Sequence, residues 1–253
     1  MIAQDDDSWK LVRFPLGRGD EARIRVRRGR AAETLGPLDG AAVVFDADGV
    51  LHASPALPPA WRGLGLAAAF LAGKRRSPFF SRATFRTSAG PREVRRRGRM
   101  VHVEHPAPLV WRADGRRGTA RDALRRLGLD PRASSDACFL DLDGVVLTAA
   151  LPAAGDLRSW QPSAPVAEVL DDVGCCCLLL FHAAGGRILA RSWLDDGREL
   201  PSPLAAGAAA CLALADADRS ACLVQFADRL ALPVRLRRDG RRIHRLSVGL
   251  RSS

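Results

Sequence analysis

The sequence predicts an α+β protein made of two pseudo-repeat domains. One local order, strand, acidic loop, helix of small residues and β-meander, occurs twice along the chain, with the helices near residues 63–73 and 204–215. The chain has 253 residues, 47% of them apolar, which is enough for one large core or for two domains of about 120 residues. We therefore expect two similar domains, each with a central helix, and a cleft between them.

The first copy of this order begins with the strand-like run "AAVVFDADGVL" at 41–51. A proline-rich loop leads from it to the helix near 63–73, whose small and apolar residues are typical of a buried helix. In the following stretch, 79–108, Thr-, Val- and Phe-containing segments are interrupted by "SAGP" and "RRRGR". Such interruptions favour hairpins.

The link between the copies contains two predicted helices. Residues 115–131 have an N-cap in Thr119 and stop signals in Gly128 and Pro131, and a second helix is expected at 165–174. We place the domain boundary near 108–118. The predicted domains are therefore 1–112 and 113–253, with the C-terminal strands returning to seal the first.

The second copy repeats the plan of the first. Residues 185–203 contain a strand and an acidic loop, and the helix at 204–215 follows. Residues 220–250 then contain three strand-like runs, with "RRDGRR" as a hairpin turn between two of them.

The six cysteines, at 138, 175, 176, 177, 211 and 222, have no CxxC spacing. The run "GCCCLLLF" at 174–181 is expected to be a buried strand, on which adjacent cysteines alternate between faces and cannot converge on one metal ion. We expect reduced core thiols, no metal and no cofactor. The N-terminal residues lack a signal-peptide pattern and no apolar run reaches about 20 residues, so the expectation is a cytoplasmic protein without a membrane partner.

The net charge of +11 would suit a nucleic-acid partner. However, each arginine-rich run flanks a predicted strand or turn, and no aromatic residues are interleaved with them. This pattern favours a solvated basic surface over a nucleic-acid site.

Five stretches of the chain resemble the PhzF family and its relatives in the diaminopimelate epimerase superfamily. Residues 56–71 correspond to the family segment that opens the first central helix, and 198–214 to the segment that opens the second. The other three stretches correspond to the meander with its P-A-P ending, to the helix that opens the second domain and to the closing strands, at 84–109, 120–131 and 224–249.

The resemblance extends over most of residues 41–250 and implies two α/β domains, each a β-barrel-like sheet around its central helix. It also implies proton transfer at carbon without a cofactor, by an acid and a base at the two helix starts, and a possible homodimer. Helix N-termini suit this chemistry because their N–H groups hold a carboxylate or a developing enolate.

The chain departs from the family at these positions. Ala56 stands where the family has the Glu of its E-L-P motif, and Arg62 where it has the His of A-G-H. In the second domain Leu200 replaces the Asp, and 203–205 replace the Thr-Gly-Ser that would hold an anion.

The polar residues that remain near these positions are the candidate site. His52, Glu199 and Asp196 are the predicted catalytic residues, and a histidine facing a carboxylate can form an acid–base pair. The predicted substrate-binding residues are Arg62, Gly63 and Ser202. The alternative for these residues is that they lie in solvent-exposed loops, with Ser202 or Asp196 capping.

Two functions follow from this pattern. The first is a divergent PhzF-like isomerase or epimerase acting on a small carboxylate or a natural-product intermediate. The second is a catalytically inactive PhzF-fold homologue that serves as a binding or structural partner. In either case Arg62 and the helix starts favour a small anionic molecule or an acidic peptide segment as the ligand.

A competing motif, D-x-D-G-V, occurs at 46–50 and 141–145. It matches the first motif of haloacid-dehalogenase-like phosphatases, in which the first Asp is a nucleophile beside Mg²⁺. Two copies, neither followed by a large α/β crossover series, argue against that enzyme. The same letters between apolar runs are also typical of a hairpin turn.

Overall fold

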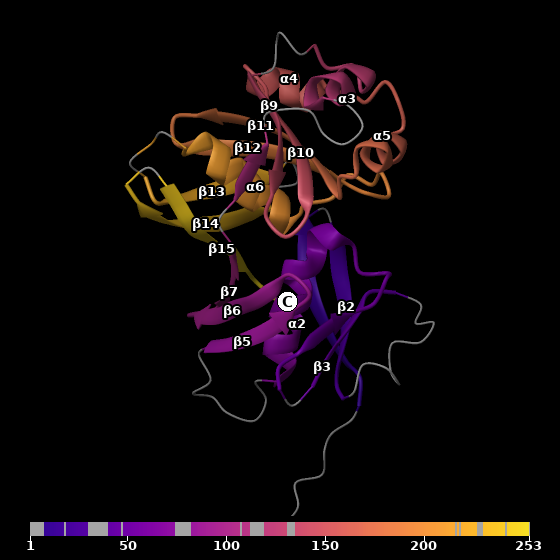
Figure 1. Cartoon of the computed structure of the whole chain (residues 1–253), viewed down its shortest axis with the longest axis vertical. Coiled ribbons are helices and arrows are strands. Elements are labelled where there is room, and N and C mark those ends of the chain that lie inside the picture. Colours follow the sequence, from indigo (N-terminus) through magenta and orange to yellow (C-terminus); the bar gives the residue numbers. More distant parts are fainter. Residues whose placement is uncertain are drawn as a thin grey trace, which may run out of the picture. The chain divides into compact units, whose positions relative to one another are not determined.

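A computed structural model shows an α+β protein with two hydrogen-bonded sheets and few helices (Figure 1). The predicted α+β class is therefore confirmed. The structure describes these residues: 8–17, 19–29, 40–46, 48–73, 82–106, 108–111, 119–130, 135–215, 217, 219–226, 230–240 and 242–252.

The chain forms two compact units that exchange short segments. Unit 1 comprises Met1–Pro15, Gly19–Glu104 and Gly249–Ser253, and unit 2 comprises Leu16–Arg18 and His105–Val248. Each unit is described on its own below. The cleft between domains and the division after residue 112 stay predictions.

The described residues of unit 1 form seven strands and a central helix. The strands β1 to β4 form one sheet in the order β1-β2-β3-β4, and β5, β6 and β7 form an antiparallel meander. Their bounds are β1 Lys10–Gly17, β2 Asp20–Arg28, β3 Ala42–Phe45, β4 Leu51–Ala53, β5 Arg82–Thr87, β6 Gly90–Arg97 and β7 Met100–His105. Between β4 and β5 lie the 3-10 turn η1, Pro59–Trp61, and the helix α2, Arg62–Gly73.

In the part of unit 2 that the structure describes there are eight strands, in the order β15-β14-β13-β12-β11-β10-β9-β8. Their bounds are β8 Leu109–Trp111, β9 Ser135–Asp141, β10 Val145–Ala150, β11 Cys177–Ala184, β12 Arg187–Leu194, β13 Ala221–Phe226, β14 Ala231–Asp239 and β15 Arg242–Leu250. The helices are α3 Ala120–Arg126, α4 Ala154–Ser159, α5 Val166–Val173 and α6 Pro203–Ala213. The predicted stop at Pro131 lies outside the described residues.

The two units repeat one topology. In unit 1, β2 is parallel to β3 and β3 is antiparallel to β4. In unit 2, β10 is parallel to β11 and β11 is antiparallel to β12 in the same way. A small-residue helix and a three-stranded antiparallel meander follow in both units. The repeated order predicted from the sequence is present, and each copy also includes an earlier pair of strands, β1–β2 and β9–β10.

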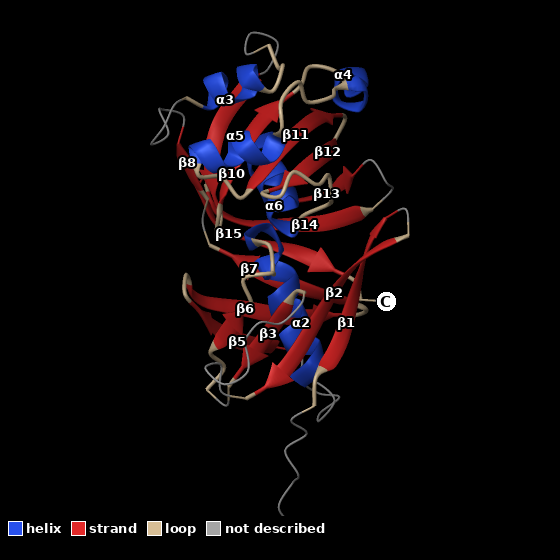
Figure 2. Ribbon diagram, turned by 90° about the vertical axis from the view of Figure 1, so that its right-hand side faces the viewer, coloured by secondary structure: helices blue, strands red, loops and turns tan. Residues whose placement is uncertain are grey.

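The helices α2 and α6 are buried on almost every side, and Figure 2 shows strands of their own units around each of them. Their alanines and glycines allow strands to come close. A Cβ added to Gly65 of α2 would lie 2.9 Å from Cγ1 of Val43, and one added to Gly207 of α6 would lie 3.0 Å from Cδ1 of Leu246. Helices that are apolar all round need such burial. The barrel-like closure of each sheet stays a prediction.

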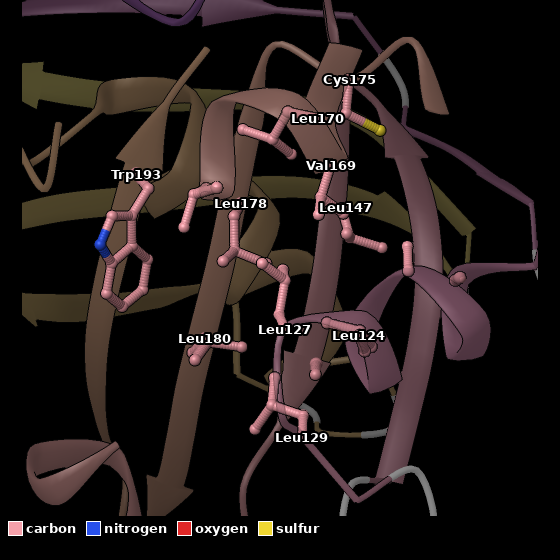
Figure 3. Packing of buried hydrophobic residues seen from close by; sticks show 14 of the residues in the cluster. Leu124, Leu127, Leu129, Leu147, Val169, Leu170, Cys175, Leu178, Leu180 and Trp193 are labelled. Atoms are coloured by element: carbon pink, nitrogen blue, oxygen red, sulfur yellow. The ribbon is translucent and has the colours of Figure 1, made fainter. Parts of the chain in front are cut away.

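A second apolar layer covers the other face of the unit 2 sheet (Figure 3). Leu178 and Leu180 of β11 contact this layer, which Leu124 of α3 and Leu170 of α5 also build. All residues of β11 from Cys177 to Phe181 are buried, which explains why this strand is continuously apolar instead of alternating.

The helix caps agree with the sequence patterns. The Thr119 Oγ1 accepts the N–H of Asp122 at 3.0 Å at the start of α3, and Gly128 adopts φ +81° just after its end. Gly174 ends α5 in the left-handed conformation at φ 69°. The predicted strand at 174–181 therefore begins later, at Cys177, because Gly174 belongs to the helix cap.

The described cysteines are free thiols. Burial raises the pKa of Cys175 and of Cys211 to about 12, so both stay protonated at neutral pH. Among the helices of the described residues, none is long and apolar enough to cross a membrane.

Candidate functional site

The predicted site residues of unit 1 lie at the start of α2 and on the strand before it. His52 is exposed on β4, where it pairs with Val44 of β3. Arg62 is exposed at the first position of α2, and Gly63 after it is buried. Ala56, at the position of the family's glutamate, is exposed in the turn before η1.

Glu199 forms a bidentate ion pair with Arg191 of β12. Its Oε1 and Oε2 each lie 2.7 Å from Arg191, accepting from Nε and Nη2. The Nη1 of the same arginine donates to the carbonyls of Leu157 at 3.0 Å and Trp160 at 2.6 Å, at the end of α4. The Arg191 side chain is 8% exposed, so its charge requires these acceptors. In the described structure Glu199 is thus the counter-ion of a buried arginine.

Asp196 stabilises the turn after β12. Its Oδ1 accepts the N–H of Arg198 at 3.0 Å, and its Oδ2 accepts from the Nε of the same residue at 2.6 Å. Burial raises the pKa of the neighbouring Asp195, and the negative charge of Asp196 raises it further. Asp196 is therefore an exposed loop residue that stabilises its own turn and caps no described helix.

Ser202 is fully buried and is the N-cap of α6. Its Oγ accepts the N–H of Ala205 at 3.2 Å, and its carbonyl accepts the N–H of Ala206 at 3.0 Å. Pro203, at the first helical position, has no N–H. Much of the hydrogen-bonding capacity of this helix start is thus used within the chain.

Both D-x-D-G-V stretches form hairpin turns, as the alternative to a phosphatase motif predicted. The first joins β3 to β4, and Asp46 Oδ1 accepts the N–H groups of Asp48 and Val50 at 3.0 and 2.8 Å. The second joins β9 to β10, and Asp141 Oδ1 accepts the N–H groups of Asp143 and Gly144 at 3.1 and 3.2 Å. These two turns are not equivalent in the repeat, since β9–β10 corresponds to β1–β2.

The second turn lies against the start of α6. A Cβ added to Gly144 would lie 3.4 Å from Cδ2 of Leu204, at the second position of that helix, and 2.8 Å from Sγ of Cys176. In the same turn Asp143 has φ 110°, the one positive φ among the described residues other than glycine. Such a conformation costs about 1–3 kcal/mol and often marks a functional site.

Asp143 faces a buried histidine. Its Oδ2 lies 3.9 Å from Nδ1 of His105, the last residue of β7, and the two side chains are 8% and 4% exposed. Both residues belong to unit 2, whose main segment begins at His105, whereas the rest of β7 belongs to unit 1. A carboxylate beside an imidazole, both shielded from water, is an arrangement able to accept and return a proton. Among the described residues, no group of three or more His, Cys, Asp or Glu side chains is placed to hold a metal ion.

This pair cannot be recognised from sequence spacing, because His105 and Asp143 are far apart in the chain. A signal was present in the D-x-D-G-V motif at 141–145, which was interpreted only as a turn or as a phosphatase motif. The position of the turn beside α6 depends on the pairing of β9 with β10 and cannot be inferred from the motif itself.

No protein-family model matches the chain, and no curated protein sequence matches it either. Solved structures match over almost the whole length. A PhzF-family phenazine biosynthesis protein from Bacillus anthracis has a TM-score of 0.68 at 10% identity, with 96% of this chain and 95% of that chain covered. A predicted epimerase from Pseudomonas aeruginosa has a TM-score of 0.62 at 15% identity, with 97% and 96% covered.

A more distant match is a hydroxyproline epimerase from Agrobacterium vitis with bound trans-4-hydroxy-L-proline. Its TM-score is 0.52 at 12% identity, with 97% of this chain and 90% of that chain covered. The chain therefore has the fold of the PhzF proteins and of these epimerases, as the sequence resemblance predicted, and it is divergent in sequence.

Proposed function

We propose that this PhzF-fold chain is a divergent isomerase or epimerase that transfers a proton at a carbon atom of a small carboxylate. The observation that carries the proposal is the buried contact between His105 and Asp143 beside the first turn of α6. Because one fold supports many activities, the residues of the site must support the chemistry as well as the fold.

In the proposed reaction His105 is the acid–base group and Asp143 is the positioning residue. His105 takes a proton from one substrate carbon and delivers it to another carbon of the resulting enolate, and the Asp143 carboxylate stabilises the imidazolium that forms in between. The 3.9 Å separation is longer than a hydrogen bond, as is common before substrate binds. The start of α6 adds partial positive charge to this region, although Ser202 already accepts the N–H groups of Ala205 and Ala206.

This assignment replaces Glu199 and Asp196 as the proposed proton carriers of unit 2. Glu199 is bound to Arg191 through both of its oxygens, and Asp196 stabilises a turn. The proposed ligand remains a small anion, and the binding of that anion by Arg62 stays a prediction. An acidic peptide segment as ligand and a homodimer stay predictions.

The second candidate is a catalytically inactive PhzF-fold homologue that binds a ligand or a partner. Ala56 and Leu200 favour it, because neither side chain at the two family positions can accept a proton. The ion pair between Glu199 and Arg191 also favours the inactive homologue, because it occupies the Glu199 carboxylate.

The two candidates are separated by incubation in D₂O with proline, 4-hydroxyproline, other amino acids and dihydro-aromatic acids, followed by mass spectrometry. We expect deuterium incorporation into at least one acid, slowed about 10²- to 10⁴-fold by His105→Gln. Asp143→Asn should slow it less and shift its pH profile. His102→Gln is the matched control, since His102 is a buried histidine of the same strand.

Circular dichroism of each variant verifies that it folds. No incorporation into any acid would support the inactive homologue. Incorporation that is unchanged in both His105→Gln and Asp143→Asn, but abolished by His52→Ala or Glu199→Gln, would return the role to the residues predicted from the sequence.

A further inference from the structure

Unit 1 contains a pocket of about 370 Å³ at the C-terminal end of α2. It lies between the helix end and strands β1, β2, β3 and β5, whose arrangement around α2 can be followed in Figure 2. This volume is within the range of small-molecule pockets, about 300 to 1,000 Å³. Since α2 has 12 residues, the pocket lies about 16 Å along the helix from Arg62, at the opposite end.

The pocket exists because this face of the helix end has small side chains. Ala69, Ala72 and Gly73, spaced i, i+3 and i+4, line it, and such residues lie on one face of a helix. A Cβ added to Gly73 would lie 3.7 Å from Cζ of Phe45. Larger side chains here would fill the space that the surrounding rings leave open.

Aromatic side chains form the apolar wall. Phe45 of β3 and Phe85 of β5 pack edge to face, with ring centroids 6.0 Å apart and an interplanar angle of 85°. Phe70 of α2 adds a third ring to the lining. Phe70 and Phe85 are 1% and 5% exposed, so the wall is built into the core and accepts a flat apolar group.

The charged lining residues are two cations and one anion. Lys10 begins β1 and Arg28 ends β2, and these two strands are neighbours in the sheet. The anion is Asp46, whose Oδ1 already accepts two N–H groups of its own turn. The C-terminal end of α2 has partial negative charge, which directs an anionic group away from the helix and toward Lys10 and Arg28.

From these features we infer that the pocket binds a small aromatic carboxylate, with its ring against Phe45, Phe70 and Phe85 and its carboxylate at Lys10 and Arg28. The guanidinium of Arg28 is suited to hold a carboxylate with two parallel hydrogen bonds. The pocket lies in unit 1 alone, whereas the proposed acid–base pair lies in unit 2. It is therefore a second binding site, independent of the proposed function.

The test uses 2-naphthoate as the probe and 2-naphthamide as its neutral analogue, with binding to the full chain measured by calorimetry. We expect saturable binding of naphthoate, and naphthamide binding that is weaker by about tenfold or more. Arg28→Gln should lower the affinity for naphthoate by about tenfold and leave the affinity for naphthamide unchanged. Ala72→Trp should abolish binding of both, because the indole fills the pocket.

Ala53→Trp is the matched control, since it adds the same ring to an exposed strand position of unit 1 outside the lining, and it should bind naphthoate as the parent does. Ala83→Trp, at a lining residue on the same face of β5 as Phe85, replaces Ala72→Trp should that variant fail to fold. Absence of saturable binding, equal affinity for the two probes, or undiminished binding in the folded tryptophan variant would overturn the inference. His105→Gln should bind naphthoate unchanged, which separates this result from the deuterium experiment.

Discussion

At the scale of single residues, Arg191 illustrates how a buried charge determines the role of its neighbours. Its guanidinium is shielded from water, so Glu199 and the carbonyls of Leu157 and Trp160 supply its acceptors. It also lies 4.7 Å from the ring centroid of Trp193. A carboxylate in such an arrangement stabilises the fold by neutralising the arginine.

We predict that Glu199→Gln lowers the free energy of unfolding by about 1–2 kcal/mol, measured by urea denaturation. The glutamine leaves a buried cation without its counter-ion, and the cost is moderated because Glu199 is 41% exposed. The control is Asp172→Asn, which removes an exposed ion pair with Arg126 at 2.7 Å and should cost less than about 0.5 kcal/mol. Equal costs for the two variants would contradict this account of Glu199.

At the scale of elements, the residues of α2 and α6 are selected more by the close approach of neighbouring strands than by helix propensity. The side chains of Val43 and Leu57 pack closely against Gly65, and those of Leu246 and Leu142 pack closely against Gly207. Glycine is a poor helix former, about 1 kcal/mol worse than alanine, so its presence in both central helices reflects the space that the strands leave.

We predict that Gly65→Ala destabilises the protein by about 1 kcal/mol. The added methyl group would lie 2.9 Å from Val43 Cγ1 and 3.0 Å from Leu57 Cδ2, and overpacking of about 1–3 kcal/mol exceeds the gain in propensity. Gly155 of α4 has no atom within 4 Å of the added Cβ, so Gly155→Ala should stabilise by about 0.5–1 kcal/mol. Thermal and urea unfolding would measure the stability of both variants. If Gly65→Ala stabilised the protein, the neighbouring strands would have moved to accommodate the methyl group.

At the scale of the whole molecule, the sequence predicted what depends on local pattern. The central helices, the cap of α3, the turn at 88–91 and the connection between β14 and β15 follow from residue type and spacing. The strand β2 was not identified, because its arginines were interpreted as a charge run. Ile24 and Val26 alternate with Arg23 and Arg25, and the two apolar side chains are fully buried.

The candidate site was less accessible from sequence, because its contacts join distant segments. The partner of Glu199 is Arg191 on the preceding strand, across a turn. The residues between the two do not indicate that this arginine is buried. The pair of His105 and Asp143 depends on where β7 ends and where the β9–β10 turn lies. Contacts of this kind follow from strand pairing and not from motif spacing.

The exchange of segments between the units leads to a further prediction at this scale. Leu250, 3% exposed, belongs to unit 1 although most of β15 belongs to unit 2. Deletion of 249–253 should therefore increase trypsin cleavage within residues 19–104, detected by mass spectrometry, while unit 2 stays resistant. Deletion of 251–253 retains Leu250 and is the control. Identical cleavage patterns for the two truncations would show that unit 1 does not need this segment.

The same exchange has a consequence for synthesis on the ribosome. Residues 19–104 of unit 1 are made first, but Gly249 and Leu250, which lie beside β7 in the strand order, follow roughly 145 residues later. At about 5–20 residues per second this delay lasts about 7–30 s. During that interval β7, with Val101 and Val103 destined for burial, is an unpaired sheet edge of the kind that promotes aggregation. Most of unit 1 is therefore translated before unit 2 but completed after it, and the nascent chain exposes a strand edge that the finished chain covers.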